Sequence, residues 1–210
     1  MLARIAAILL LPLALAGCGI NQIPTLEEQA KADWSQVQNQ YQRRADLIPN
    51  LVETVRGYAD HEREVLNEVV EARASASKIE LNVDDLTNPA LVEQFNAAQE
   101  RLSGALGRLL VTVERYPDLK ANQNFLQLQS QLEGTENRIA VARRDYIEAV
   151  RLYNTELKTF PGRLWAATLY SSYEPMATFE VPQATFSPPQ VDFSRGSSSN
   201  SQPAPAPNAN

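Results

Sequence analysis

The sequence predicts an all-α protein, an antiparallel up-down bundle of about four long helices followed by an extended segment rich in proline and phenylalanine. Apolar residues recur every three or four positions over long stretches, which is the period of a helix with one buried face. Between Thr25 and Phe160 there are three prolines and four glycines, whereas eight of the 13 prolines lie from Pro161 onward. Short connections between long helices favour antiparallel neighbours, so we expect the bundle to cover residues 25–170.

The first helical stretch is expected from about Thr25 to Ile79. Thr25 and Glu28 have the spacing of a capping box, which marks a helix start. Pro49 lies inside the stretch and lacks the amide hydrogen that would bond to the carbonyl of Ala45. We therefore expect a kink or a break at Pro49, and a break would divide this stretch into two of the four helices.

A second helix is expected after a loop at residues 80–88. Asn88 followed by Pro89 is typical of a helix start, because a capping side chain precedes proline at the first helical position. Pro117 is expected to end this helix.

The third long helix is expected from about Asn122 to Thr159. The pair Pro161-Gly162 should break it, and a short helix from Leu164 to Leu169 should follow.

The C-terminal part is expected to lack regular structure of its own. Residues 171–195 should run extended over the bundle, with an exposed binding tail as the alternative. Residues 196–210 have a Ser, Asn, Pro and Ala composition that cannot bury a core and should be disordered. The aromatic side chains expected to dock on the bundle are Phe179, Phe186 and Phe193.

Residues 1–17 have the layout of a secretory signal peptide. Arg4 precedes an apolar run of 12 residues, whereas a membrane-spanning helix needs roughly 20. The junction Leu15-Ala16-Gly17-Cys18 resembles the bacterial lipobox, in which the cysteine thiol receives a diacylglyceryl group and the signal is cut before it. The new amine can then receive a fatty acid such as palmitate.

Cys18 is the only cysteine of the chain, so no internal disulfide can form. We expect a lipidated linker over residues 18–24 that holds the protein on a membrane. The alternative is an uncleaved N-terminal segment that spans the membrane.

We expect lipid, and not positive charge, to hold the protein on the membrane. The formal charge is −6, and it becomes −7 when Arg4 leaves with the signal. Such a chain lacks the basic footprint of a nucleic-acid-binding protein and the polybasic patch that binds anionic headgroups. Gly19 stands where Asp often retains a lipoprotein at the inner membrane. We therefore expect a cell-envelope lipoprotein, on the periplasmic face of the outer membrane if the source has two membranes.

No residue pattern indicates catalysis. The sequence has no Ser-His-Asp, Cys-His or glycine-rich phosphate-loop arrangement, so we expect a protein that is not an enzyme and uses no cofactor. His61 and Glu64 are weak candidates for a metal site, because they lie three positions apart on a helix. The more ordinary interpretation of His61 is a surface histidine.

Several charged residues suggest contacts between helices. Glu62 and Glu156 fall on apolar helix faces, as does Thr135. Buried carboxylates must be paired, so we expect Glu–Arg bridges between helices. The pair Arg43-Arg44 is interpreted as part of a solvated face. The arginines considered for the bridges are Arg73, Arg138, Arg143 and Arg144.

Five runs of residues, in this order, resemble the LemA family over about residues 20–193. The resemblance implies an envelope protein with an antiparallel helical bundle, and it supplies no reaction. Many members have a longer N-terminal membrane helix without cysteine, and Cys18 departs from that pattern. The runs are Arg44-Ala-Asp-Leu-Ile-Pro-Asn-Leu-Val-Glu53, Gly57-Tyr-Ala-Asp-His-Glu62, Tyr116-Pro-Asp-Leu-Lys-Ala-Asn122, Leu132-Glu-Gly-Thr-Glu-Asn-Arg-Ile139 and Tyr153-Asn154.

The leading functional hypothesis is a non-enzymatic interaction or scaffold module with an unidentified envelope protein as partner. A homo-oligomer is a further expectation. The contact site is expected around the proline, because a proline in a helix frees a carbonyl and makes a non-repeating surface. The more ordinary alternative is that Pro49 only bends the helix to fit the bundle. The alternatives are a ligand- or metal-binding envelope protein and an accessory to an envelope protease. The expected contact residues are Asp46, Pro49, Asn50 and Glu53.

Overall fold

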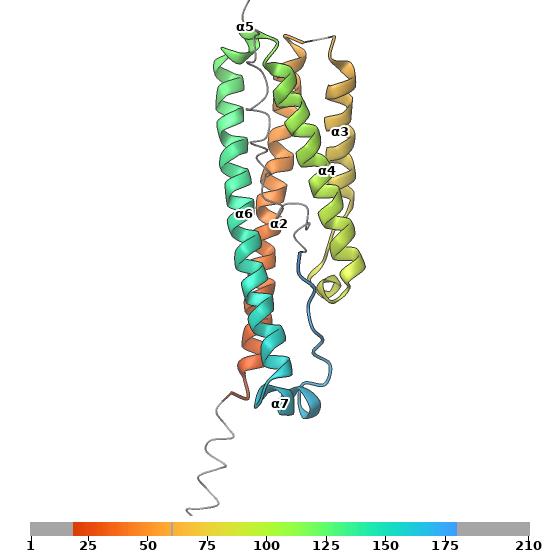
Figure 1. Cartoon of the computed structure of the whole chain (residues 1–210), viewed down its shortest axis with the longest axis vertical. Helices are drawn as coiled ribbons and strands as arrows, with labels where there is room; N and C mark the ends of the chain where they lie inside the picture. Colours follow the sequence, from red (N-terminus) through yellow and green to blue (C-terminus); the bar gives the residue numbers. More distant parts are fainter. Residues whose placement is uncertain (1–18, 60, 180–210) are drawn as a thin grey trace, which may run out of the picture. The chain divides into compact units, whose positions relative to one another are not determined.

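A computed structural model describes residues 19–59 and 61–179 of the chain. The described residues belong to one compact unit. Most of the described residues are helical and none of them is in a strand, which confirms the all-α prediction (Figure 1). The helices are α2 (Gln22–Arg56), α3 (Arg63–Lys78), the 3₁₀ turn η1 (Val83–Thr87), α4 (Pro89–Val113), α5 (Pro117–Lys120), α6 (Gln123–Lys158) and α7 (Gly162–Thr168).

The two longest helices, α2 and α6, form the backbone of the bundle. They have 35 and 36 residues and lie side by side in opposite directions. The shorter helices α3 and α4 form a second antiparallel pair that covers one half of them (Figure 1). The four long helices thus run up, down, up and down along the chain, as predicted.

The predicted break at Pro49 is wrong, because α2 continues through this proline to Arg56. The carbonyl of Ala45 that Pro49 leaves without its helical donor has another donor. Nε of Arg73, on α3, donates to this oxygen at 2.8 Å. Because a neighbouring helix supplies the missing hydrogen bond, the proline costs α2 less than it would in an isolated helix.

The chain turns back after Gly57 instead. The amide groups of Tyr58 and Ala59 donate to the carbonyl of Val55, and Glu62 precedes the first turn of α3. The predicted first stretch is therefore two helices, divided eight residues beyond the proline.

The start of α2 also differs from the prediction. The helix begins at Gln22, and Thr25 lies within its first turn, where its hydroxyl donates to the carbonyl of Asn21 at 2.7 Å. Ile23 is fully buried. Part of the stretch assigned to the linker, residues 22–24, therefore belongs to the bundle.

The other predicted helix starts are confirmed. The side chain of Asn88 accepts from the amide of Ala90 with Pro89 at the first helical position, and the side chain of Asn122 accepts from the amide of Phe125. The loop before α4 contains η1, and α4 ends before the predicted Pro117. The break at Pro161-Gly162 and the short helix after it are present as α7.

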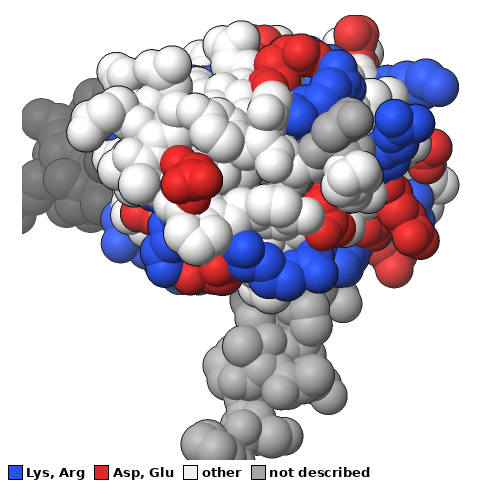
Figure 2. Space-filling model, turned by 90° about the horizontal axis from the view of Figure 1, so that it is seen from above, with Lys and Arg blue, Asp and Glu red and all other residues white. Residues whose placement is uncertain are grey.

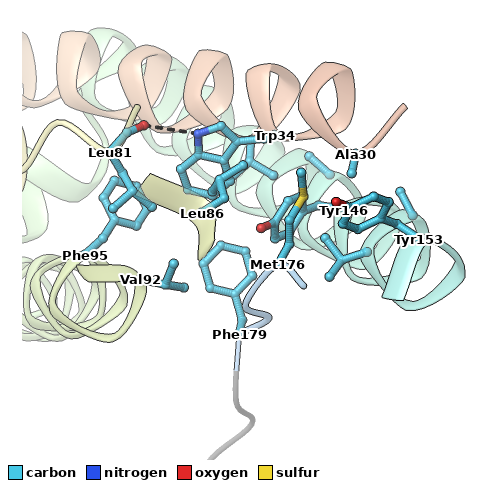
Figure 3. Close-up of a cluster of buried hydrophobic side chains, with 14 of the residues drawn as sticks. Ala30, Trp34, Leu81, Leu86, Val92, Phe95, Tyr146, Tyr153, Met176 and Phe179 are labelled. Carbon is cyan, nitrogen blue, oxygen red and sulfur yellow. Dashed lines mark hydrogen bonds between the residues drawn. The ribbon is translucent and has the colours of Figure 1, made fainter. Parts of the chain in front are cut away.

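A segment without helix completes the core where α3 and α4 do not cover α2 and α6. We call residues 170–179 the C-terminal strap. Phe179 in this strap is 5% exposed, and its ring centre lies 5.9 Å from that of Trp34 (Figure 3). The predicted docking of Phe179 on the bundle is therefore confirmed. Phe186, Phe193 and the tail 196–210 lie outside the described residues.

Side chains of α6 hold the backbone of the strap. Nδ2 of Asn154 donates to the carbonyl of Met176 at 2.8 Å, and Oδ1 of Asn154 accepts from the backbone N–H of Met176 at 2.9 Å. The hydroxyl groups of Tyr146 and Tyr153 donate to the carbonyls of Ala177 and Glu174. Burial raises the pKa of both phenols, so they stay protonated and act as donors.

None of the described helices is both long enough and apolar enough to cross a membrane. The apolar residues of these helices instead face the interior of the bundle.

The contact between Arg73 and the proline turn predicts a rescue. Arg73→Met should lower the free energy of unfolding by about 1–3 kcal/mol, because the buried carbonyl of Ala45 loses its donor. The same change should cost clearly less in a Pro49→Ala chain, where the restored amide can donate to Ala45. Urea unfolding of the purified protein, followed by circular dichroism, measures both costs.

The exposed Arg101 on α4 provides the control, since Arg101→Met should change stability little in either background. Equal costs of Arg73→Met with and without the proline would contradict the assigned role of Arg73.

Candidate functional site

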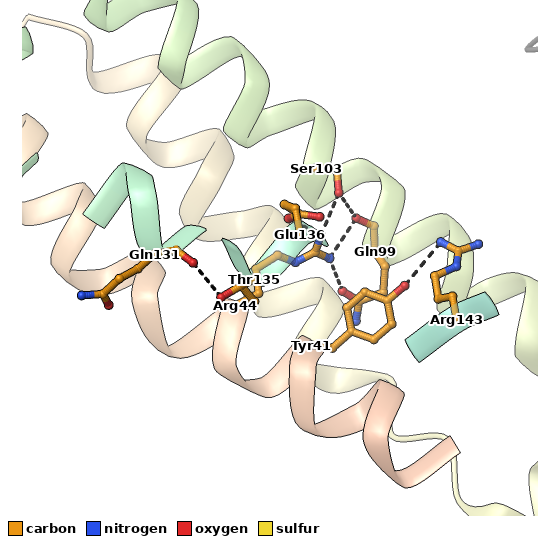
Figure 4. Close-up of polar contacts among 8 residues, drawn as sticks. All are labelled: Tyr41, Arg44, Gln99, Ser103, Gln131, Thr135, Glu136 and Arg143. Carbon is orange, nitrogen blue, oxygen red and sulfur yellow. Dashed lines mark hydrogen bonds and ion pairs between the residues drawn. The ribbon is translucent and has the colours of Figure 1, made fainter. Parts of the chain in front are cut away.

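A layer of polar side chains crosses the middle of the bundle, and Arg44 lies at its centre (Figure 4). The side chain of Arg44 is 1% exposed, although α2 displays most of its charged residues to solvent. We call the layer formed by this residue and its partners the polar layer. It contains Arg44, Gln99, Ser103 and Glu136.

The guanidinium of Arg44 is bonded to two other helices. Nη1 donates to Oγ of Ser103 at 2.8 Å and to Oε1 of Glu136 at 2.9 Å. Nη2 donates to Oε1 of Gln99 at 2.6 Å and to its carbonyl at 3.3 Å. Arg44 of α2 therefore joins α4 and α6, and the interpretation of Arg44 as part of a solvated face is wrong. Arg43 is exposed, as expected.

Tyr41 and Arg143 extend the polar layer toward the apolar cluster around Trp34. We call this cluster the Trp34 core, and its aromatic members include Trp34, Phe95, Tyr146 and Phe179. The guanidinium carbon of Arg44 lies 5.0 Å from the ring centre of Tyr41, and Nη1 of Arg143 donates to its hydroxyl at 3.4 Å. Burial raises the pKa of Tyr41, and the two arginines oppose this only in part. Tyr41 is therefore a neutral phenol near pH 7, and its place in the layer is that of a hydrogen-bond partner.

Thr135 lies next to the polar layer and is fully buried, in agreement with its predicted position on an apolar face. Its hydroxyl donates to the carbonyl of Gln131 at 2.7 Å and accepts from Nη2 of Arg138 at 3.1 Å. The layer can hold a charge inside the bundle because both terminal nitrogens of Arg44 donate to protein acceptors. Nε of Arg44 is also buried and has no hydrogen-bond partner in the described part of the chain.

A hollow of about 210 Å³ opens beside the polar layer, between α2, α4 and the segment that follows α3. Its lining includes Tyr41, Ala45 and Gln99. Pockets that enclose small molecules generally measure about 300–1,000 Å³, so this hollow is small for a ligand site.

A second set of contacts joins two connections at one end of the bundle. Nδ2 of Asn122 donates to the hydroxyl of Tyr58 at 2.8 Å. The carboxylate of Glu62 accepts from the hydroxyl of Tyr116 at 2.9 Å and pairs with Nη2 of Arg115 at 3.0 Å. The expected Glu–Arg bridge is thus present for Glu62. Seen from above, acidic and basic side chains lie intermixed along one side of this end (Figure 2).

The other residues expected to form bridges have different partners. Glu156 is half-buried and has no arginine partner among residues 19–59 and 61–179. Arg73 donates to a backbone carbonyl, and Arg144 pairs with its neighbour Asp145. Bridges between long helices are instead formed by Arg44 of α2 with Glu136 of α6, and by Arg108 of α4 with Glu68 of α3.

The residues expected to contact a partner lie together on the outer face of α2. Asp46, Pro49, Asn50 and Glu53 are all exposed and follow the helical period. The side-chain contacts of Asp46 and Glu53 are local, with Gln42 and Arg56. We call these four residues the α2 stripe.

The metal and lipid candidates have different outcomes. His61 and Glu64 are exposed. Within the described part of the chain, no three His, Cys, Asp or Glu side chains come together as metal ligands, so the metal prediction gains no support from the structure. Cys18 lies outside the described residues.

The sequence contains a pattern that indicates an interior position for Arg44, and the interpretation of Arg43-Arg44 as a solvated face overlooked it. Residues 37, 41, 44, 48, 51 and 55 are separated by steps of four and three, and the other five are apolar and buried. Such spacing places Arg44 on the interior seam of a long helix. Gln99 and Glu136 offer no comparable signal, because only the packing of α4 and α6 brings them to Arg44.

Comparisons with known proteins give a consistent picture. The model of the LemA family matches residues 33–193. Protein LemA of Metamycoplasma hominis is 26% identical over 140 residues, which cover 67% of this chain and 60% of that protein. Magnetosome protein MamQ 2 of Paramagnetospirillum magneticum is 26% identical over 159 residues, covering 67% of this chain and 58% of that protein. The chain therefore spans about three fifths of the length of these relatives.

The polar layer predicts an order of stabilities. Gln99→Leu should lower the free energy of unfolding by about 3 kcal/mol, because it leaves a buried guanidinium without its shortest hydrogen bond. The double variant Arg44→Met/Gln99→Leu should be more stable than Gln99→Leu alone, since the buried charge is gone. Chemical denaturation of the three proteins gives the comparison.

Gln94→Leu, at an exposed glutamine of the same helix, is the control and should stay within about 0.5 kcal/mol of the original protein. A double variant less stable than Gln99→Leu would show that the cation does not depend on its buried acceptor.

Proposed function

The chain belongs to the LemA family, and from this premise we propose that it is a lipid-anchored helical module of the cell envelope that binds a protein partner and catalyses no reaction. The observation that carries the proposal is that the buried polar groups bond to one another inside the bundle. Arg44 and its partners join three helices, which leaves the outer face of α2 to make contacts with other molecules.

The position of the first helix supports anchoring close to the membrane. Three residues, 19–21, separate Cys18 from α2. A methyl group built on Gly19 would lie 3.7 Å from Cγ of Pro161, so the start of the described chain is next to the turn between α6 and α7. Lipid at Cys18 would place this end of the bundle at the membrane surface.

The α2 stripe is the proposed partner site. Asp46 is 24 residues beyond the start of α2 at Gln22, which corresponds to about 36 Å along the helix axis. The stripe offers carboxylates, an amide and a proline on one exposed face. A partner with basic groups or amide donors at matching spacing would be complementary to it, and complementary charge mainly confers specificity.

Removing the proposed lipid site should release the protein. Cys18→Ser should shift the chain from the membrane fraction to the soluble fraction and abolish the mass added by acyl chains, because the described helices are not membrane-spanning. Fractionation and intact-mass measurement test this, and circular dichroism of the released chain confirms that the bundle is folded. Retention on the membrane at the mass of the uncleaved chain would show instead that the N-terminal segment spans it.

A photoreactive amino acid at position 50 tests the partner site. In native membranes, the chain with this group in place of Asn50 should give a crosslinked product that mass spectrometry identifies. The same group in place of Asn137, an exposed asparagine of α6, is the matched control and should give none. No product from position 50, or the same products from both positions, would contradict a partner site on the α2 stripe. A product of two copies would identify the partner as the chain itself.

A further inference from the structure

The end of the bundle formed by α7 exposes large apolar side chains. Phe160 is 85% exposed, Leu169 60% and Leu164 49%. Three of the nine exposed large hydrophobic residues among the described ones thus fall within ten positions of the chain. We call these three residues the apolar end. A concentration of this kind commonly marks a surface that contacts a membrane or another molecule.

The apolar end belongs to a fixed part of the bundle. The amide of Arg163 donates to the carbonyl of Thr159 at 2.7 Å, which ties α7 to the end of α6. Gly162 is buried against Glu156, and a side chain at this position would clash with the carbonyl of Glu156. Trp165 packs from α7 against the Trp34 core, which leaves Leu164 and Leu169 outside.

The same end of the bundle carries the start of the described chain. Gly19 lies against Pro161, the residue that follows Phe160. The α-carbon of Cys18 must be about 3.8 Å from that of Gly19, because adjacent residues in a trans peptide have this separation. Acyl chains on Cys18 would therefore begin within a few residues' reach of Phe160, and a bilayer that takes them up must lie against this end.

We propose that the apolar end enters the interfacial layer of the bilayer in which Cys18 is anchored, so that the bundle stands on the membrane by lipid and protein together. The inference rests on the proposed lipid anchor. Interfacial helices bury an apolar face at the boundary of headgroups and acyl chains, and aromatic residues favour this depth. The basic residues Lys158 and Arg163 share this end with Glu156 and Glu174, so binding should depend on apolar area more than on lipid charge.

Spin-label accessibility tests the proposal on the lipidated full-length mature chain. In that chain the sulfur of Cys18 is blocked, so Phe160→Cys introduces the free thiol that takes the label. The protein is placed in vesicles of phosphatidylethanolamine and phosphatidylglycerol. Accessibility to oxygen, which concentrates in lipid, is compared with accessibility to a water-soluble nickel complex. Val111→Cys is the matched control. Val111 is 72% exposed and lies near the C-terminal end of α4, at the end of the bundle away from α7.

The ratio of oxygen to nickel accessibility should be several-fold higher at position 160 than at position 111. It should change little when phosphatidylglycerol is replaced by phosphatidylcholine. Equal, water-like ratios at both positions in a vesicle-bound chain would overturn the inference and leave the anchor intact. A label at position 160 shielded from both reagents would show that protein covers this end, which also overturns it. A chain that fails to bind vesicles and takes a label at Cys18 would refute the anchor itself.

Discussion

A guanidinium buried in a helical bundle can be kept only if acceptors surround it, and this constraint organises the structure around Arg44. Gln99 and Ser103 on α4 and Glu136 on α6 supply the acceptors. A shift of either helix by one turn, about 5.4 Å, would carry these acceptors away and leave a buried cation without hydrogen bonds. The polar layer therefore selects one register among those that apolar packing alone would allow.

The next residue of α2 brings the fourth long helix to the same level. Ala45 follows Arg44, and its carbonyl, which Pro49 leaves free, accepts from Arg73 on α3. All four long helices are thus joined by hydrogen bonds from two consecutive residues of α2. Pro49, expected to kink or break the helix, instead frees the carbonyl of Ala45, and this oxygen is the acceptor that binds α3.

On the side of the polar layer that faces α7, different elements cover α2 and α6. This part of the bundle also contains the end proposed to be anchored. The helices α3 and α4 cover one half of α2 and α6, and the strap and η1 cover the Trp34 core in the other half. The strap has no helical hydrogen bonds of its own, so Tyr146, Tyr153 and Asn154 bond its backbone. The chain reaches the strap by way of α7, and this path brings Pro161 to Gly19. Because the hydrogen bonds that fix the helices lie inside the bundle, one end is free for the proposed contact with lipid and the outer face of α2 is free for the proposed partner.

The sequence by itself determined the helices, most of their ends and the exposure of the α2 stripe, because periodicity, caps and prolines act within a few residues of the chain. It also contained the interior position of Arg44, in the spacing of its apolar neighbours. Only the tertiary structure decided that α2 continues through Pro49 and that Gln99 and Glu136 surround Arg44. The donor and the acceptors come from helices far along the chain, and their approach depends on how side chains pack between helices. Local patterns contain no information on that packing.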